Sequence, residues 1–501
     1  MWFKKVKIKW VWSTALFLVL LVLAIIFVVP VLKTKDPVQI DRPNIVLVIL
    51  DTVRYDYTSL ELKFGEKMDL TPHLKSLASK STVFPNSWSN APWTVPAHAS
   101  MFTGLLPAQH ACTSKQVYLD KRFPTIAEIL NKSGYETTAF FSNPWLNNEA
   151  TGLMRGFQTI EEVWVGGLSK LSRGMGNQGG VLINQNIQKW LKNRTQKKPF
   201  FLFVNYLEAH LPYDPHLEYR EKHLKNLKPD DSISIKWAHE FNAGLYEADK
   251  VDWKKVREMY AGDVNTADNL LGVLLQMLKE FGVYDKTVII VTSDHGENLG
   301  EHGLMEHQFS VHENVLLVPL VIRAPGILKQ GINHQPVMLS DLFDTIIELA
   351  GAEYTADADV DAATDTDTVF SHSLIPAKGT TQSERRRYIV SEYAGAPGGL
   401  LEHLKHLNPQ LDTTPLSLAY KTVTDGEWRF TISSDAKRML YNLDKDPQQT
   451  IDYSSMYPEI ANEMEGYLEN IFSILKQAAD KPARQLDEET KKKLKSLGYI
   501  Q

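Results

Sequence analysis

The sequence has a single cysteine, Cys112, which excludes an internal disulfide and a metal site built from several cysteines. It also lacks an excess of basic residues, because 54 Lys and Arg stand against 60 Asp and Glu and leave a net charge of −6. Nucleic-acid-binding proteins carry clustered positive charge, so we expect no nucleic acid partner. No internal repeat is present, and 43% apolar with 23% charged residues is the composition of a globular chain. These features exclude a collagen-like or disordered protein.

Long uncharged runs are also rare, and the one that stands out lies near the N-terminus, at residues 11–32. Twenty-two apolar residues suffice for a bilayer core of about 30 Å at about 1.5 Å per residue. Four lysines precede the run within residues 1–10, and lysines gather on the cytoplasmic side of a membrane. The run is longer than the apolar region of a cleaved signal peptide, and no small-residue cleavage site follows it. The sequence therefore predicts a single-pass anchor in the cell membrane, with residues 1–10 cytoplasmic and the body of the chain outside.

The body alternates between apolar runs and helical patterns after a polar linker at residues 33–43. The runs are typical of strands buried on both faces, and together they predict a mostly parallel sheet covered by helices on each side, a three-layer α/β (αβα) architecture. The expected strands are 44–50, 137–142, 199–206, 287–293 and 318–325, and the expected helices are 69–81, 123–133 and 265–282. We predict a catalytic domain over 44–350, an acidic loop or linker over 351–385 and a smaller C-terminal α+β subdomain with a helical tail over 386–501.

Residue types that can bind ligands or metals follow several of these expected strands. Asp51 follows the first strand, His210 follows the strand at 199–206, and Asp294 and His295 leave the strand at 287–293 together. Ligands of open α/β sheets bind at the carboxyl ends of the strands, so we expect these side chains at one rim. Carboxylate oxygen and imidazole nitrogen are metal-ligand atoms. The alternatives are a turn or cap role for the acids and a structural role for the histidine.

A threonine lies at the start of another expected helix. Pro96 fits the first turn of that helix, which places Thr94 near its free N–H groups, a ready anion site. A hydroxyl beside a metal at such a site is how a nucleophile is activated. Simple N-capping by Thr94 is the alternative.

Seven segments together resemble the sulfatase family of the alkaline phosphatase superfamily, in the family's order, over roughly residues 43 to 500. They are NIVLVILDTVR, TVPAHASMFTGLLPAQH, PFFLFVNYLEAHLPYDP, SDHGENLGEHG, HENVLLVPLVIRAPG, MLYNLDKDPQQ and DEETKKKLKSLGYI. The resemblance implies an alkaline-phosphatase-like fold and a metal-dependent ester hydrolase acting on a small-molecule, glycan or lipid ester.

The resemblance also implies roles for individual residues. The implied ligands of one divalent metal ion (Mn, Zn, Mg or Ca) are Asp51, Asp294 and His295, with the oxygen of the nucleophile Thr94 also in contact. His210 matches a histidine that contacts the ester, and His307 one that protonates the leaving group. His98 is a further catalytic candidate and stands where many members have an arginine. Arg54 and His302 are candidate substrate-binding residues, and a structural salt bridge is the alternative for Arg54. His312 is an alternative proton donor, ranked below His307.

The chain departs from the family at the nucleophile. Sulfatases carry Cys or sometimes Ser in CxPxR, which is converted to formylglycine, whereas this stretch reads TVPAH. We therefore expect no formylglycine and a direct attack by Thr94, as in the phosphate-ester members of the superfamily. The prediction is a hydrolase of phosphate mono- or diesters. A sulfuric ester hydrolase and a transferase of phosphate-linked head groups onto membrane lipid or glycan remain as alternatives, and a non-enzymatic binding protein is disfavoured because the ligands and the hydroxyl are retained.

Overall fold

The computed structural model describes residues 42–60, 69–163, 178–195, 197–224, 231–354, 371–376 and 388–475. All of these fall within one compact unit, Asp41–Gln501. Most of the predicted linker and acidic loop, and the helical tail beyond residue 475, lie outside the described residues. The division of the body at residues 350 and 386 stays a prediction.

The expected placement in the cell membrane requires a correction. Across the described ranges, no helix has the length and apolar character needed to cross a bilayer. Residues 11–32, on which the expectation rested, lie outside those ranges. The single-pass placement with a cytoplasmic N-terminus is therefore not supported and is withdrawn.

The main sheet of the described residues has eight strands in the order β11-β2-β10-β7-β1-β6-β4-β5. The central strand β1 pairs in parallel with β6 on one side and β7 on the other, whereas β10 runs antiparallel to both β7 and β2. The predicted mostly parallel sheet is confirmed. The strands of this sheet are β1 (Asn44–Leu50), β2 (Thr82–Val83), β4 (Glu136–Phe141), β5 (Thr159–Glu162), β6 (Phe200–Tyr206), β7 (Thr287–Thr292), β10 (Leu320–Arg323) and β11 (Gly331–Ile332).

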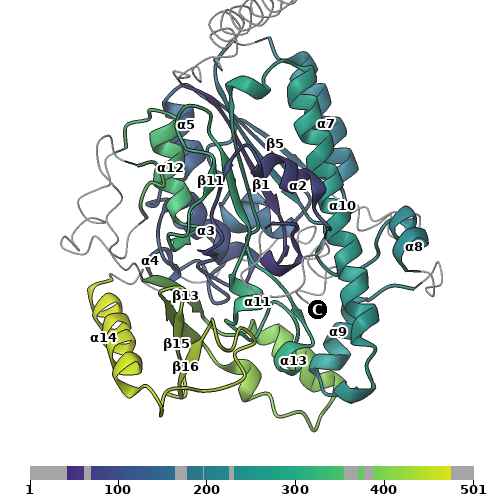
Figure 1. Ribbon diagram of the computed structural model, residues 1–501, viewed down its shortest axis with the longest axis vertical. Helices are drawn as coiled ribbons and strands as arrows, with labels where there is room; N and C mark the ends of the chain where they lie inside the picture. The colour runs from purple at the N-terminus through teal and green to yellow at the C-terminus, as the bar shows by residue number, and fades with distance from the viewer. Residues whose placement is uncertain are drawn as a thin grey trace, which may run out of the picture. The chain divides into compact units, whose positions relative to one another are not determined.

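Helices cover both faces of this sheet (Figure 1). Successive side chains of a strand point to opposite faces, and β1 shows the consequence. Ile45, Leu47 and Ile49 belong to the apolar core under α3, α5 and α12, while the intervening residues of β1 belong to the core under α2, α7 and α10. These helices are α2 (Pro72–Ala78), α3 (Thr94–Thr103), α5 (Ile126–Lys132), α7 (Gly180–Asn193), α10 (Trp253–Glu280) and α12 (Asp341–Leu349).

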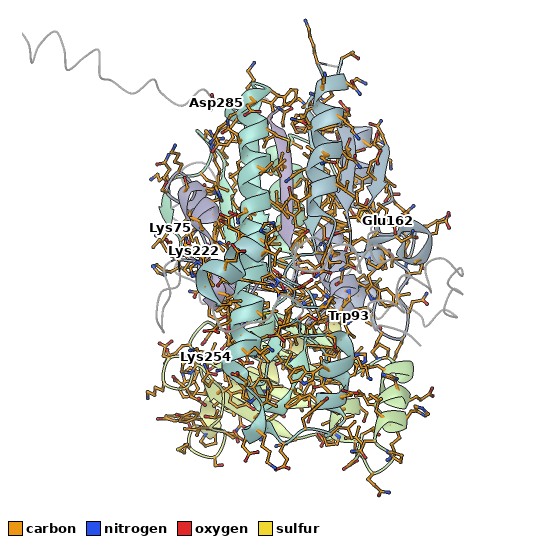
Figure 2. All side chains as sticks on the ribbon, turned by 90° about the vertical axis from the view of Figure 1, so that its right-hand side faces the viewer. Lys75, Trp93, Glu162, Lys222, Lys254 and Asp285 are labelled. Carbon is orange, nitrogen blue, oxygen red and sulfur yellow. The ribbon has the colours of Figure 1, made fainter. Side chains whose placement is uncertain are left out.

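Helix α10 is longer than the sequence pattern predicted. The expected helix at 265–282 is its second half, and the first half begins at Trp253. Buried Val256, Met259 and Val264 continue the apolar stripe toward the N-terminus, which explains the extension. Figure 2 shows the helix running along the body from Lys254 near one end to Asp285, just past the other.

A separate antiparallel sheet of four strands follows in the C-terminal part, in the order β13-β14-β15-β16. It confirms the expected smaller α+β piece. Buried Arg429 of β15 pairs with Glu313, which also accepts the indole N–H of Trp88, so the two parts share a polar contact. The elements of this part are β13 (Ile389–Tyr393), α13 (Gly398–Leu407), β14 (Tyr420–Thr424), β15 (Trp428–Ser433), β16 (Arg438–Asn442) and α14 (Pro458–Ile474).

Shorter elements fill the connections. Two small two-stranded sheets pair β3 with β12 in parallel and β8 with β9 in antiparallel orientation. Their bounds, with those of the remaining helices, are β3 (Ser87–Trp88), α4 (Pro107–His110), α6 (Asn148–Thr151), α8 (Leu217–His223), α9 (Ile235–Asn242), β8 (Asn298–Leu299), β9 (Met305–Glu306), α11 (Glu313–Leu316) and β12 (Val337–Met338).

Candidate active site

The carboxyl ends of the central parallel strands bring the predicted polar residues to one rim. Ile49 of β1 pairs with Thr292 of β7, so the residues that leave these two strands, Asp51 and Asp294, emerge side by side. On the other side of β1, Leu50 pairs with Tyr206, the last residue of β6. The parallel pairing therefore explains why residues more than 200 positions apart meet.

Three buried side chains at this rim form a candidate metal centre. Asp51, Asp294 and His295 are each 0% exposed, and each offers a ligand atom within 4.8 Å of the other two. Within the described ranges this is the one group of three or more His, Cys, Asp or Glu side chains with such spacing.

The hydrogen bonds of the two carboxylates leave one oxygen of each unused. Asp51 Oδ2 accepts from the amides of Asn143 and Asn205, both at 2.9 Å. Asp294 Oδ1 accepts the backbone N–H groups of Thr52 and His295, at 3.3 and 3.0 Å. Asp51 Oδ1 and Asp294 Oδ2 are buried and have no hydrogen-bond partner among the described residues. Buried carboxylate oxygens without a donor are unfavourable unless a cation compensates them, so the donor set fits a divalent metal.

The histidine of this group is held in the form that binds a metal. His295 Nδ1 donates to the carbonyl of Gly296 at 3.0 Å, which leaves the lone pair of Nε2 directed into the site. Burial lowers the pKa of His295 well below its ordinary value, and the nearby imidazole of His307 lowers it further. Burial likewise raises the pKa of Asp294 well above its ordinary value, and the neighbouring Asp51 raises it further. Both shifts show that the site is poorly solvated and crowded with like charges.

Thr94 is the first residue of α3 rather than its cap, since Trp93 holds the N-cap position. Its hydroxyl lies 3.4 Å from Nε2 of His295 and 3.2 Å from the amide nitrogen of Asn143. Gly104, at φ +72°, ends the helix, and a Cβ there would lie 2.6 Å from Ser371 Oγ. The hydroxyl of Thr94 thus faces the candidate metal centre, and its role as a nucleophile stays a prediction.

His98 lies one turn further along α3 and is fully buried. Its Nδ1 donates to the carbonyl of Thr94 at 2.9 Å and lies 3.6 Å from Asp294 Oδ2, while Nε2 has no partner in the described part of the chain. Burial lowers the pKa of His98 to about 4, so the ring is neutral near pH 7. It therefore does not supply the fixed positive charge of the arginine that many family members have at this place.

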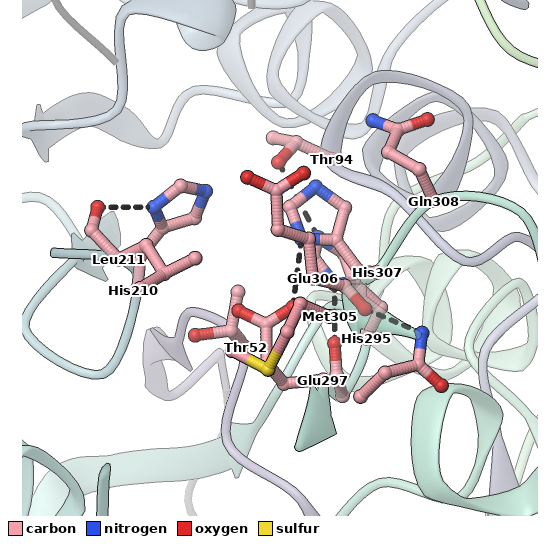
Figure 3. Close-up of polar contacts among 12 residues, drawn as sticks. Thr52, Thr94, His210, Leu211, His295, Glu297, Met305, Glu306, His307 and Gln308 are labelled. Carbon is pink, nitrogen blue, oxygen red and sulfur yellow. Dashed lines mark hydrogen bonds and ion pairs between the residues drawn. The ribbon is translucent and has the colours of Figure 1, made fainter. Parts of the chain in front are cut away.

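Two further histidines face the same centre (Figure 3). The ring of His307 lies 4.4 Å from that of His295 and 5.4 Å from that of His210, measured between centroids. His307 Nδ1 lies 3.3 Å from Glu297 Oε1, and His210 Nδ1 donates to the carbonyl of Leu211 at 2.8 Å. Burial lowers the pKa of His307, but Glu297 and then Glu306 raise it more, so the net shift is upward.

Arg54 and His302 are held in other contacts. The Arg54 guanidinium makes two hydrogen bonds to Asp56, at 2.9 and 2.7 Å, and one to Glu301 at 2.9 Å, the geometry of the salt bridge that the sequence left as an alternative. His302 stacks on His312 with ring centroids 3.6 Å apart. The contacts described for His302 do not include the group around Thr94.

Sequence reasoning missed the residues that orient the candidate ligands. Asn143 lies two residues after β4, and Asn205 interrupts the apolar run of β6. Both follow the same rule of polar residues at carboxyl ends that identified Asp51, so this signal was available. Glu297 stands inside the SDHGENLGEHG segment, and only its contact with His307 distinguishes it from the other glutamate there, Glu301.

Comparisons with known proteins agree on a family. A family model described as Sulfatase matches residues 43–352. Arylsulfatase K of Rattus norvegicus is 24% identical over 514 residues, which cover 93% of this chain and 84% of the relative. An arylsulfatase of Clostridium perfringens is 23% identical over 366 residues, covering 62% of this chain and 75% of the relative.

Solved structures share the fold. A phosphonate monoester hydrolase of Agrobacterium radiobacter matches with a TM-score of 0.64 at 20% identity, over 86% of this chain and 95% of the other. A 2-O GAG sulfatase matches with a TM-score of 0.65 at 17% identity, over 88% of this chain and 97% of the other. At such identities the likeness concerns the fold alone.

Proposed function

The chain belongs to the sulfatase family of ester hydrolases, and from this premise we propose that it hydrolyses phosphate mono- or diesters with the hydroxyl of Thr94 as the nucleophile. The observation that carries the proposal is the place of Thr94 Oγ1, 3.4 Å from His295 Nε2 at the start of α3. Threonine cannot form the aldehyde that sulfatases make from Cys or Ser. A direct attack of a hydroxyl on phosphorus needs no such aldehyde.

Several groups of the chain would prepare the attack. Asn143 donates to both Thr94 Oγ1 and Asp51 Oδ2, so it fixes the hydroxyl against the carboxylate. The first N–H groups of α3 have no partner inside the helix and carry its positive dipole end, which favours an anionic ester. Phosphoryl transfer asks a protein chiefly for positioning and charge stabilisation, and this arrangement offers both.

A divalent metal would be held by Asp51, Asp294 and His295, whose unused oxygens and Nε2 lone pair converge. When bound, such an ion polarises an ester oxygen and lowers the pKa of a neighbouring hydroxyl. The donor set suits Mn, Zn, Mg or Ca.

His307 is the proposed proton donor to the leaving group. Glu297 accepts from its Nδ1, which orients the ring and leaves Nε2 as the nitrogen that gives a proton. In the proposed step the bond from Thr94 Oγ1 to phosphorus forms as the bond to the leaving alcohol breaks. The alcohol takes a proton from His307, and the hydroxyl proton of Thr94 goes to solvent. Water then hydrolyses the phosphothreonine, and His210 would contact the ester throughout.

A sulfuric ester hydrolase is the second candidate, favoured by the arylsulfatases among the relatives. The solved structures with the same fold include both phosphonate monoester hydrolases and a sulfatase, so the fold does not choose between phosphorus and sulfur. The transferase alternative rested on the membrane placement, and no described residue favours it.

The test compares nitrophenyl esters on the full chain: phosphate mono- and diester, phenylphosphonate and sulfate, each with Mn, Zn, Mg or Ca added. Thr94→Ala should abolish turnover and Thr94→Ser should retain it. Mass spectrometry of acid-quenched enzyme should find phosphate on Thr94. Dominant sulfate turnover, or phosphate turnover that survives Thr94→Ala, would refute the proposal.

A further inference from the structure

We propose that Glu208 is a positioning residue that holds His210 in the active site through Gln178. This inference rests on the proposed role of His210 in contacting the ester. Glu208 follows β6 and lies two residues before His210. It is 1% exposed, and none of the steps above uses it.

The carboxylate of Glu208 binds a backbone segment from another part of the chain. Its Oε1 accepts the N–H of Gly180 at 2.8 Å and the N–H of Gln178 at 3.2 Å. These residues lie at and just before the start of α7, whose first N–H groups need acceptors. The carboxylate therefore fixes residues 178–180 against the end of β6.

The side chain of Gln178 in turn binds the backbone at His210. Its side-chain Nε2 donates to the backbone carbonyl of His210 and, at 3.4 Å, to that of Glu208. Residues 178–180 and 208–210 are thus joined by four hydrogen bonds, all donated by Gln178 or Gly180 and accepted by Glu208 or His210. The backbone at His210 is tied on its carbonyl side, and its ring is tied by Nδ1 to Leu211.

The sequence at 179–180 permits this close approach. A Cβ at Gly180 would lie 2.7 Å from Glu208 Oε1 and 2.3 Å from Leu270 Cδ1. Gly179 has φ +122°, which L side chains rarely adopt. Both glycines are therefore explained by the contact with Glu208 and by the turn that leads into α7.

Only one of the two carboxylate oxygens of Glu208 makes the hydrogen bonds described above. Oε2 is buried and has no hydrogen-bond partner within the described ranges. Oε1 alone accepts the N–H groups of Gln178 and Gly180, so a glutamine, whose amide keeps this oxygen, should bind residues 178–180 as the glutamate does. Burial raises the pKa of Glu208 to about 7, which agrees with a weakly compensated charge. In addition to burial, its charge raises the pKa of two nearby titratable groups, Tyr206 on β6 and Asp263 on α10.

The position of His210 is what this contact would set. Its ring centroid lies 5.4 Å from that of His307, so a displacement of the 208–210 backbone would shift it relative to the reacting ester. A misplacement of about 1 Å at a catalytic group can lower a rate by about 100-fold.

The experiment is a double-mutant cycle on the full chain with the best nitrophenyl ester. Glu208→Ala and Gln178→Ala should each lower kcat/KM by about tenfold or more, because His210 is no longer held. Neither should lower it further in a His210→Ala background, since the effect passes through that ring. Glu208→Gln keeps the holding oxygen and should rescue most of the loss.

Asp268→Ala is the matched control. Asp268 is also fully buried and accepts two backbone N–H groups, those of His73 and Leu74 at the start of α2. The Asp268→Ala variant should lose stability as Glu208→Ala does, but without a comparable loss of kcat/KM. Gln178 is only partly buried and its removal spares the carboxylate, so Gln178→Ala carries the test if Glu208→Ala does not fold.

Carbethoxylation of His210, followed by mass spectrometry, reads its position without turnover. The 3% exposed ring should react slowly in the wild type and faster in Glu208→Ala and Gln178→Ala, but not in Asp268→Ala. The proposal is overturned if the variants lower kcat/KM by the same factor in the His210→Ala background, or if the modification rate does not change. If the wild type hydrolyses no ester, the proposed function fails and the modification rate alone decides about Glu208.

Discussion

Replacing Asp294 by Asn should stabilise the metal-free protein and abolish its stabilisation by a divalent cation. Asp51 and Asp294 are fully buried, and their ligand oxygens lie within 4.8 Å. Two unit charges at 4.8 Å repel by about 3.5 kcal/mol at an effective dielectric constant of about 20. Proton uptake by Asp294, whose pKa is raised by burial and by Asp51, relieves part of this repulsion, so removing the charge gains less than the full repulsion.

The hydrogen bonds of Asp294 favour the same result. An Asn oxygen can still accept the N–H groups of Thr52 and His295 that Asp294 Oδ1 accepts. The new amide N–H₂ would replace Oδ2, which lies 3.3 Å from His295 Nε2, an acceptor in the neutral ring. The substitution therefore replaces an unsatisfied oxygen with a satisfied donor.

The assay is urea unfolding with chelator and with excess Mn or Zn. The wild type should gain about 2.7 kcal/mol at a metal concentration about 100 times Kd, and Asp294→Asn should gain almost nothing. Asp268→Asn, a buried carboxylate outside the candidate metal centre, should lose stability in both conditions and keep the metal increment. The reasoning is refuted if Asp294→Asn is less stable than the wild type in chelator, or if metal stabilises both proteins equally.

Three further outcomes follow from the contacts of the site. Glu297→Gln should lower kcat by about 10- to 100-fold because His307 loses the carboxylate that orients it and raises its pKa, while metal-dependent stabilisation, measured by thermal unfolding, is retained. Asn143→Leu should weaken metal affinity by about 10- to 100-fold, measured by competition with a chelating dye, because Asp51 loses one of the two amides that fix it. The pKa of Glu208 is raised from 4.5 to about 7, so the folded state binds this proton more tightly than the unfolded state does. The stability that this tighter binding contributes is lost as the pH rises from 4.5 to about 7. The stability of the wild type relative to Glu208→Gln should therefore fall by about 3 kcal/mol between pH 4.5 and about 7, measured by urea unfolding, and a constant difference would contradict the assignment.

The main strands and several site residues could be read from the sequence for one physical reason. Continuous apolar runs mark strands buried on both faces, and parallel pairing brings their carboxyl ends together. Asp51 and the Asp294–His295 pair follow directly from that rule, and the structure brings them within reach of one ion. The identity of residue 94 is also a matter of sequence alone, because no fold converts a threonine into formylglycine.

The partners of each polar side chain were decided by the tertiary structure. Arg54 pairs with Asp56 and Glu301, and His302 stacks on His312. Local sequence does not identify these partners, since each is chosen by packing, and the substrate-binding roles of both residues stay predictions.

The orienting residues show the same limit most clearly. Asn205 and Asp51 are 154 positions apart, and Glu208 and Gly180 are 28 apart, yet each pair makes a hydrogen bond at 2.9 or 2.8 Å. The sequence alone determined which residue types stand at the strand ends and that the nucleophile position carries a hydroxyl. Only the tertiary structure decided which of these groups point inward and which groups hold them, because a buried hydrogen bond depends on the separation and direction of two backbones that meet only after folding.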